Sequence, residues 1–184
     1  MYGIYIGRFC PIHLGHQKVI NQMRLETEQS VIFVGSCNSP TTLRNFFTFR
    51  ERHFLIKTLY PDMSVIGLPD FPSDEDWLIN LISHVQALFG QPKREMTEWA
   101  DNVVPFPKGK ADVVFYAGCT EDAQLLIERG FKVQEVNRYD GVKVSAQEVR
   151  DCLIHDKELR FLDPKIQEQV KNIFKSKWED FKRV

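Results

Sequence analysis

Cysteine is scarce in this chain of 184 residues, and its few cysteines are scattered. Cys10, Cys37, Cys119 and Cys152 form no CxxC pair. This spacing predicts neither a zinc knuckle nor a disulfide framework. We therefore expect reduced, mostly structural thiols and no metal ligands among them.

The sequence also lacks a surplus of charge and a long hydrophobic run. It has 24 basic and 25 acidic residues, whereas a non-specific binder of nucleic acid or anionic membrane needs a basic surplus. No apolar stretch approaches the length of a membrane span, and no signal-peptide pattern precedes the first strand-like run. We expect a cytoplasmic protein with no nucleic-acid and no membrane partner. The length favours one domain over residues 1–184.

Strand-like and helical patterns alternate through most of the chain. The predicted strands are Tyr2–Ile6, Val31–Gly35, Met63–Leu68, Val113–Ala117 and Lys132–Val136. The predicted helices are Gln17–Glu28, Phe49–Tyr60, Asp74–Phe89 and Glu121–Arg129. This order predicts the α/β class: a Rossmann-like, doubly wound parallel sheet of about five strands.

Two segments depart from this alternation. Residues 143–184 are a helical C-terminal part, in which an apolar stripe from Ile166 to Phe181 predicts a closing helix packed on the domain. Gln91–Lys110 is long for a loop, so it is either a flap or partly helical around Arg94–Ala100. A homo-oligomer stays open.

The segment GRFCPIHLGH, from Gly7 to His16, joins the first predicted strand to the first predicted helix. A helix N-terminus offers unpaired N–H groups and a partial positive charge, and Gly15 allows a ligand to approach the backbone. His13 and His16 lie three residues apart on the first turn, where both imidazoles can donate to phosphate oxygens. The pattern predicts a phosphate-binding site.

Further polar residues follow the other predicted strands. Because parallel strands bring their carboxyl ends to one edge of a sheet, we expect Ser36–Arg44, Asp70–Trp77 and Gly118 beside the opening motif. Histidines together with Arg8 and Arg150 indicate phosphoryl or nucleotidyl transfer, since cationic donors stabilise charge on phosphate oxygens. No Walker-type motif is present. In-line displacement at the α-phosphate of a nucleoside triphosphate fits best, with Mg²⁺ carried mainly by the phosphates.

These motifs resemble those of the nicotinamide-mononucleotide adenylyltransferases of the archaeal type and of bacterial Nudix-fused enzymes, within the HxGH nucleotidyltransferase superfamily. The first segment resembles GRFxPxHxGH. Gly35 to Arg52 resembles GS…T-[LI]-x-N/D-P-F-T-x-x-E-R. Asp70 with Trp77, Tyr116 to Gly118, and Ser145 to Arg150 resemble the family's D-[IF]…W, Y-S-G and SxTxxR elements; the basic stretch Arg138–Lys143 precedes the last.

The resemblance implies adenylyl transfer from ATP to nicotinamide mononucleotide, which gives NAD and pyrophosphate. The implied catalytic residues are His13, His16 and Arg44. The implied ATP-binding residues are Gly7, Arg8, Phe9, His13, Gly15, His16, Gly118, Ser145, Gln147 and Arg150. The implied acceptor-binding residues are Ser36, Arg44, Asp70 and Trp77, with Trp77 stacked on the nicotinamide ring.

Three of the matched positions have a purely structural alternative. Trp77 shares its predicted helix with Leu78 and Leu81, so it is also a candidate core aromatic. Glu51 and Arg52 are candidates for an ion pair at a helix start rather than for ligand contacts.

The sequence departs from the family pattern at four positions, where Gln147 replaces Thr, Phe46 replaces Pro, Asp74 stands for Asn and Cys10 for Gln. Two alternatives stay open. One is a nucleotidyltransferase of the same superfamily with another phosphorylated acceptor, and the other is a non-catalytic nucleotide-sensing domain.

Overall fold

A five-stranded parallel sheet forms the centre of the computed structural model, which describes residues 1–93, 109–119, 123–137 and 144–182. Its strands are β1 (Tyr2–Gly7), β2 (Gln29–Val34), β3 (Ser64–Gly67), β4 (Val113–Ala117) and β5 (Val133–Glu135), in the order β3-β2-β1-β4-β5. Each pairing is parallel. The predicted α/β Rossmann-like sheet is confirmed, and its strand ends lie within two residues of the prediction.

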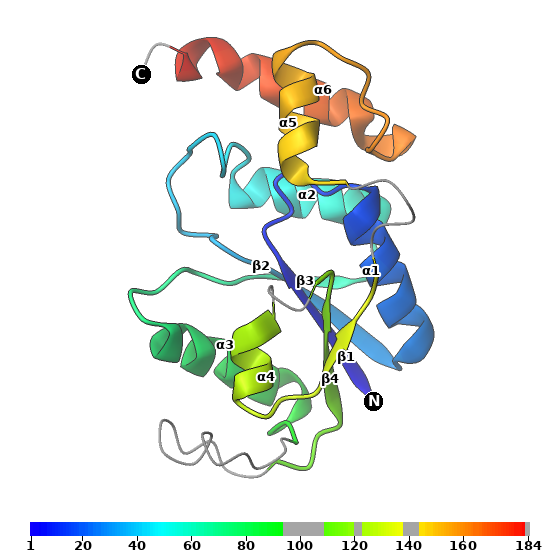
Figure 1. Ribbon diagram of the computed structural model, residues 1–184, viewed down its shortest axis with the longest axis vertical. Coiled ribbons are helices and arrows are strands. Elements are labelled where there is room, and N and C mark those ends of the chain that lie inside the picture. The colour runs from blue at the N-terminus through cyan, green and yellow to red at the C-terminus, as the bar shows by residue number, and fades with distance from the viewer. Residues whose placement is uncertain (94–108, 120–122, 138–143, 183–184) are drawn as a thin grey trace.

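Helices cover both faces of this sheet (Figure 1). They are α1 (Leu14–Glu26), α2 (Phe49–Leu59), α3 (Asp74–Phe89), α4 (Gln124–Glu128), α5 (Ala146–Ile154) and α6 (Pro164–Phe181). Figure 1 shows α3 and α4 on one face and α1 and α2 on the other, with α5 and α6 stacked beyond α2. Of the predicted helix from Glu121, residues 121–122 lie outside the described part of the chain.

Two hydrophobic cores lie between these layers. On the side of α1 and α2, Tyr5 and Ile32 of the sheet pack with Val19 and Leu55. On the side of α3 and α4, the alternate sheet residues pack with Leu81 and other side chains of those helices. Strands of a doubly covered sheet are apolar on both faces, which explains why all five residues of β4 are buried.

The closing helix packs on the domain as predicted. Ile166, Val170 and Phe174 of α6 are buried. The Phe46 ring, which stands where the family has proline, lies 4.9 Å from the Phe174 ring and 6.1 Å from the Trp178 ring. An aromatic side chain at this position therefore fills the space between the loop before α2 and the closing helix.

The two ends of the irregular segment 91–110 meet beside β4. The Ala111 N–H donates to the Gln91 carbonyl at 2.9 Å, and the Lys93 N–H donates to the Ala111 carbonyl at 2.9 Å. The predicted helical stretch Arg94–Ala100 lies outside the described residues.

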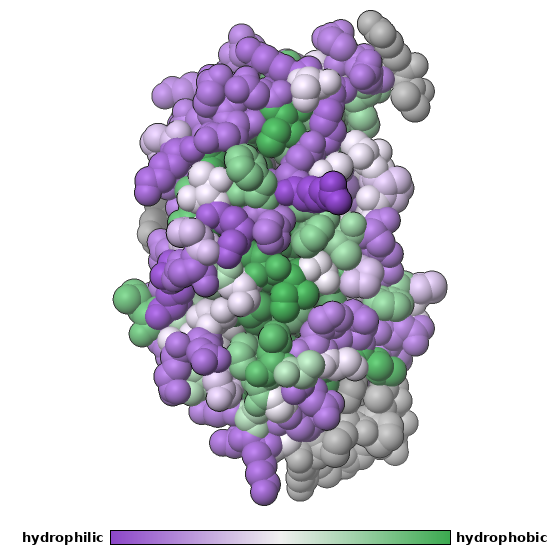
Figure 2. All heavy atoms as spheres, turned by 180° about the vertical axis from the view of Figure 1, so that it is seen from behind, coloured by the Kyte–Doolittle hydropathy of each residue, from purple (hydrophilic) through white to green (hydrophobic). Residues whose placement is uncertain are grey.

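Within the described ranges, no helix is long and apolar enough to cross a membrane. Figure 2 views the molecule from behind, where hydrophobic residues gather near the centre of the face and hydrophilic residues surround them.

A buried tyrosine next to α2 predicts sensitivity to alkali. Tyr60 is 5% exposed, and its hydroxyl donates to Asn21 Oδ1 at 3.0 Å. Burial raises the pKa of Tyr60 to about 12. Because the folded pKa is above the unfolded value of about 10, the resulting stabilisation is complete below pH 10 and is lost as the pH rises towards 12.

We expect this group to contribute on the order of 2 kcal/mol to the loss of unfolding free energy over that window. Tyr60→Phe removes the titrating hydroxyl, so its stability should fall less steeply with pH than that of the wild type. Urea unfolding at pH 8 to 12 measures both slopes. Parallel slopes would contradict the assignment.

Candidate active site

The first helix opens with a reciprocal pair of histidines. His13 is the N-cap, and its Nδ1 accepts the His16 N–H at 3.3 Å, while His16 Nδ1 accepts the His13 N–H at 3.2 Å. The helix therefore begins at Leu14, three residues before the predicted start at Gln17. The placement of His13 and His16 on the first turn is confirmed. The range predicted from apolar spacing began too late, because this capping box closes the turn with side chains that carry no ordinary helix-start signal.

This arrangement fixes where each histidine carries its proton. A neutral imidazole has one N–H and one acceptor nitrogen, and in both rings Nδ1 accepts from the backbone. The proton therefore resides on Nε2 in both rings. The two ring centroids are 3.7 Å apart, and the planes are inclined by 28°. Two Nε2–H donors thus come from neighbouring, nearly stacked rings.

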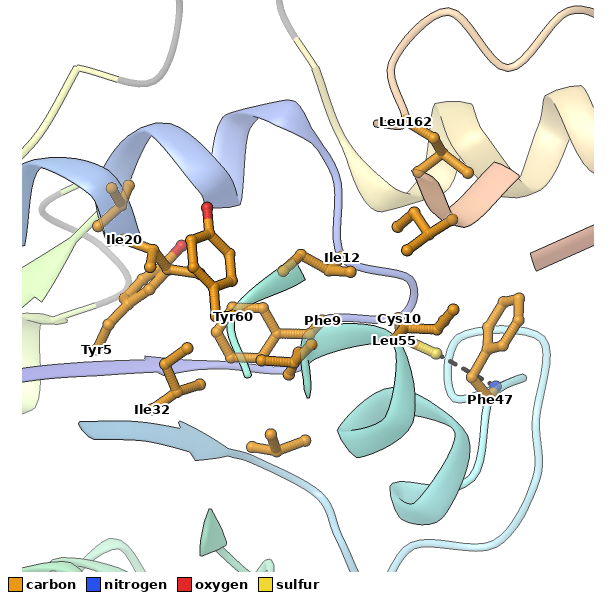
Figure 3. Close-up of a cluster of buried hydrophobic side chains, with 14 of the residues drawn as sticks. Tyr5, Phe9, Cys10, Ile12, Ile20, Ile32, Phe47, Leu55, Tyr60 and Leu162 are labelled. Atoms are coloured by element: carbon orange, nitrogen blue, oxygen red, sulfur yellow. Dashed lines mark hydrogen bonds between the residues drawn. The ribbon is translucent and has the colours of Figure 1, made fainter. Parts of the chain in front are cut away.

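The apolar residues of the opening motif anchor it in the core. Phe9 and Ile12 are fully buried, and Cys10 is 2% exposed. Figure 3 shows these side chains pointing into the cluster around Tyr5 and Leu55. The Phe47 N–H donates to Cys10 Sγ at 3.4 Å, so cysteine in place of glutamine here packs inward. Burial raises the pKa of the Cys10 thiol.

The loop after β1 bends sharply at Phe9. Its φ is 49°, in the left-handed region that most side chains avoid. The buried Phe9 ring packs 4.8 Å from the His16 ring, centroid to centroid. Phe9 therefore orients a histidine, whatever contact it makes with a nucleotide.

A cleft of about 1030 Å³ opens beyond the carboxyl ends of β1, β2 and β3. It brings together most of the residues predicted from the sequence: Gly7, Arg8, Phe9, His13, His16, Ser36, Arg44, Asp70, Trp77, Ser145, Gln147 and Arg150. Gly15 and Gly118 are buried and are not among the cleft-lining residues. The roles of all these residues stay predictions. Leu43, Asn45 and Asp151 also line the cleft. Leu43 belongs to the predicted segment Ser36–Arg44, whereas Asn45 and Asp151 had no predicted role.

Three arginines give one part of the cleft a positive charge. Arg8 and Arg44 are exposed, and Arg150 is half-buried. Arg150 Nη1 donates to the Cys10 carbonyl at 2.8 Å, which ties α5 to the opening motif. Burial lowers the pKa of Arg150, and the charge of Arg44 adds to that effect. A bound polyphosphate would relieve this repulsion, since guanidinium groups pair with phosphate oxygens.

The N-terminus of α5 faces the same cleft. Ser145 is its N-cap: Ser145 Oγ accepts the Glu148 N–H at 3.2 Å, and Glu148 Oε2 accepts the Ser145 N–H at 2.7 Å. Figure 1 shows this end of α5 pointing towards the loop after β1. The Ser145 hydroxyl also donates to Glu148 Oε2 at 3.0 Å, so it would exchange that partner on donating to a ligand. The basic stretch 138–143 lies outside the described residues.

Asp70 makes several hydrogen bonds at the wall of the cleft. Its carboxylate accepts from Ser36 Oγ at 3.0 Å and from Ser39 Oγ at 2.6 Å. The Asp70 N–H donates to Asn38 Oδ1 at 2.8 Å, and the Asn38 amide donates to the Asp70 carbonyl at 3.0 Å. These bonds join the loops after β2 and β3 into one polar wall.

Trp77 stands between the cleft and the core. It lines the cleft and is half-buried, and it also packs against the core beneath α3. Ser73 caps α3 one turn earlier, where Ser73 Oγ accepts the Asp76 N–H at 3.1 Å. Trp77 therefore has a surface on the cleft, as a stacking residue needs, and also a contact with the core, as a core aromatic residue has.

If Trp77 stacks on the acceptor's cationic ring, Trp77→Ala should raise the KM for nicotinamide mononucleotide and leave the KM for ATP nearly unchanged. The expected loss is about 1–2 kcal/mol, or about 5- to 30-fold. Trp77→Phe, which keeps an aromatic face, serves as the control and should lose less. Steady-state kinetics with each substrate varied measures the effect. A lower unfolding temperature with both KM values unchanged would make Trp77 a core residue only.

Glu51 and Arg52 do not form an ion pair with each other, which was the structural alternative to ligand contacts predicted from the sequence. Glu51 pairs with Lys177 of α6 at 2.8 Å, and its carboxylate also accepts the Thr48 N–H at 2.7 Å. Arg52 is 2% exposed and donates to backbone carbonyls instead.

Among the described residues, no group of three or more His, Cys, Asp or Glu side chains is arranged to hold a metal ion. Mg²⁺ in nucleotide sites in general is bound largely through substrate phosphates and water.

Comparison with known proteins identifies the family. The family model of the cytidylyltransferase-like proteins matches residues 4–106. The chain is 30% identical to the nicotinamide-nucleotide adenylyltransferase of Pyrococcus furiosus over 182 residues, which cover 93% of this chain and 83% of that one. It is 29% identical to the Thermococcus sibiricus protein of the same name, over 94% of this chain and 84% of that one.

Solved structures share the fold. The bifunctional NMN adenylyltransferase/ADP ribose pyrophosphatase of Francisella tularensis, solved with AMP and a manganese ion, superposes with a TM-score of 0.74 at 18% identity. The match covers 98% of this chain and 51% of that enzyme, so the chain spans about half of its length. With the sequence matches above, the chain belongs to the cytidylyltransferase-like family, among the nicotinamide-nucleotide adenylyltransferases.

Proposed function

We propose that this protein transfers the adenylyl group of ATP to nicotinamide mononucleotide and forms NAD and pyrophosphate. The observation that carries this proposal is the reciprocal pair of His13 and His16 at the start of α1, in one cleft with three arginines. The family membership supports it. The ends of the cleft also differ in character, as two different substrates require.

The cationic end suits the triphosphate. We assign the α-phosphate to His13 and His16, because the helix N-terminus and two preset donors stabilise charge that builds on its oxygens. Arg8 and Arg150 would neutralise the β- and γ-phosphates, and the N-terminus of α5 at Ser145 offers further N–H donors. Gln147 would supply an amide where the family has a threonine hydroxyl.

The polar and aromatic end suits the mononucleotide. Trp77 offers a face for the positively charged nicotinamide ring, and Asp70 and Ser36 offer hydrogen-bonding groups. Arg44 would bind the acceptor phosphate between the two ends and direct its oxygen at the α-phosphorus. A new oxygen–phosphorus bond then forms as the bond to the β-phosphate breaks, and pyrophosphate leaves with the electron pair.

Mg²⁺ enters this scheme with ATP, as the Mg²⁺–ATP substrate complex, and its charge offsets that of the leaving pyrophosphate. The arginines and histidines of the chain orient the phosphates around it. A cytoplasmic location, a single domain over residues 1–184 and a homo-oligomer stay predictions.

An assay with a panel of acceptors tests the proposal. The purified protein is incubated with ATP, Mg²⁺ and one acceptor at a time: nicotinamide mononucleotide, nicotinic acid mononucleotide, and a phosphorylated polyol or lipid head group. Dinucleotide and pyrophosphate are measured together. We expect equimolar NAD and pyrophosphate with nicotinamide mononucleotide. Turnover only with a non-pyridine acceptor would replace the proposed acceptor, and nucleotide binding without turnover would favour a sensing domain.

A further inference from the structure

Among the described residues, Arg52 has the largest fully buried side chain by residue volume. Its Nη1 donates to the Arg8 carbonyl at 2.8 Å and to the Gly35 carbonyl at 2.7 Å, and its Nη2 donates to the Ser36 carbonyl at 3.0 Å. Arg8, Gly35 and Ser36 all line the cleft. One guanidinium group therefore holds three backbone positions of the candidate site.

These contacts lie where β1 and β2 separate. The Gly35 N–H donates to the Gly7 carbonyl at 2.9 Å, which is the last bond that joins the two strands directly. Beyond it, Phe9 and Ser36 both have positive φ, of 49° and 54°, as the segments after β1 and β2 turn away from each other. Arg52 Nη1 donates to one carbonyl from each segment at this point, so it joins the two segments where the sheet no longer does.

The two segments contact different substrates in the proposed reaction. The segment after β1 contains Arg8 and continues to the histidines on the ATP side. The segment after β2 contains Ser36 and continues to Arg44 on the acceptor side. Reaction requires the acceptor phosphate and the α-phosphorus to meet within a few tenths of an ångström of the productive geometry. A group that fixes the spacing of the two segments therefore fixes the distance between the acceptor phosphate and the α-phosphorus.

We infer that Arg52 is a positioning residue, which sets the distance between the ATP subsite and the acceptor subsite without touching either substrate. This inference rests on the proposed function. A lysine cannot replace Arg52, because an ammonium group lacks the rigid planar fork that reaches three carbonyls at once.

Arg52→Lys tests the inference. We expect kcat to fall about 10- to 100-fold, the scale of a small misplacement of reacting groups. The Kd of a non-hydrolysable ATP analogue alone, and that of nicotinamide mononucleotide alone, should each change less than about threefold, since each subsite stays intact. The control is Arg129→Lys, at a largely buried arginine that pairs with Glu75 outside the cleft lining, and its kcat should not change.

Two results would overturn the inference: an unchanged kcat in Arg52→Lys, or a loss of both binary affinities in proportion to kcat, as a structural defect produces. If Arg52→Lys does not fold, Arg52→Gln is assayed with added guanidinium or ammonium ions. Recovery of turnover with guanidinium alone supports the inference, and any other pattern overturns it. A wild type that makes no NAD would defeat the proposed function instead, so the two failures are distinguishable.

Discussion

His16→Ala should lower kcat by about two to three orders of magnitude, the scale of losing one preset donor to a developing oxyanion. The affinity for ATP should fall much less, because the donor contributes most when charge builds on the α-phosphate. Stopped-time assays of NAD formation and calorimetric titration of an ATP analogue measure the two quantities.

The alanine variant has a second defect that must be separated from the first. His16 Nδ1 accepts the His13 N–H, so alanine also weakens the start of α1. His16→Gln keeps an acceptor that can close a capping box but has no imidazole. We expect Gln to restore stability and not turnover. His84→Ala, at a histidine on α3 outside the cleft lining, is the unchanged control. A His16→Gln enzyme with near-wild-type kcat would remove His16 from the catalytic residues.

Arg150→Ala should weaken ATP binding by about 10- to 100-fold and leave acceptor binding nearly unchanged. A hydrogen bond to a charged group contributes about 1.5–3 kcal/mol, which corresponds to that range. Arg150 also donates to the Cys10 carbonyl, so Arg150→Lys, which keeps the charge, separates attraction for phosphate from positioning of the loop. Calorimetric titration of each variant with ATP analogue and with mononucleotide gives both affinities.

The matched control for Arg150 is Arg24→Ala, at an exposed arginine that pairs with Asp62 outside the cleft lining. Its ATP affinity should equal that of the wild type. Gln147→Thr, in the first turn of α5, should be tolerated or improve ATP affinity slightly. An Arg150→Ala variant with unchanged ATP affinity would leave α5 as a packing helix.

The sequence predicted the fold well because its signals were local and repeated. Apolar runs such as Val113–Ala117 lie within single elements, and this strand was confirmed. The gathering of Arg8, Ser36 and Asp70 at one cleft followed from the parallel topology, since the carboxyl ends of neighbouring strands share an edge.

What the sequence did not predict depends on contacts between distant segments. The bonds of Arg52 to the carbonyls of Arg8 and Gly35 span 44 and 17 residues. Every residue has a backbone carbonyl, so the sequence does not indicate which carbonyls accept from Arg52. The reciprocal cap of His13 and His16 used side chains that are rare in that role, so the helix began earlier than its apolar spacing indicated. Both surprises lie at the candidate site, where special geometry outweighs local propensity.

The most direct test of the central claim follows the α-phosphorus itself. The purified protein is given nicotinamide mononucleotide and ATP labelled with ³²P at the α-position, and the products are separated over a single turnover. The account predicts that all converted label appears in NAD, that pyrophosphate is unlabelled, and that His16→Gln slows this transfer by the same factor as kcat. Label that stays on the protein, or that accumulates in AMP without forming NAD, would contradict direct adenylyl transfer at this cleft.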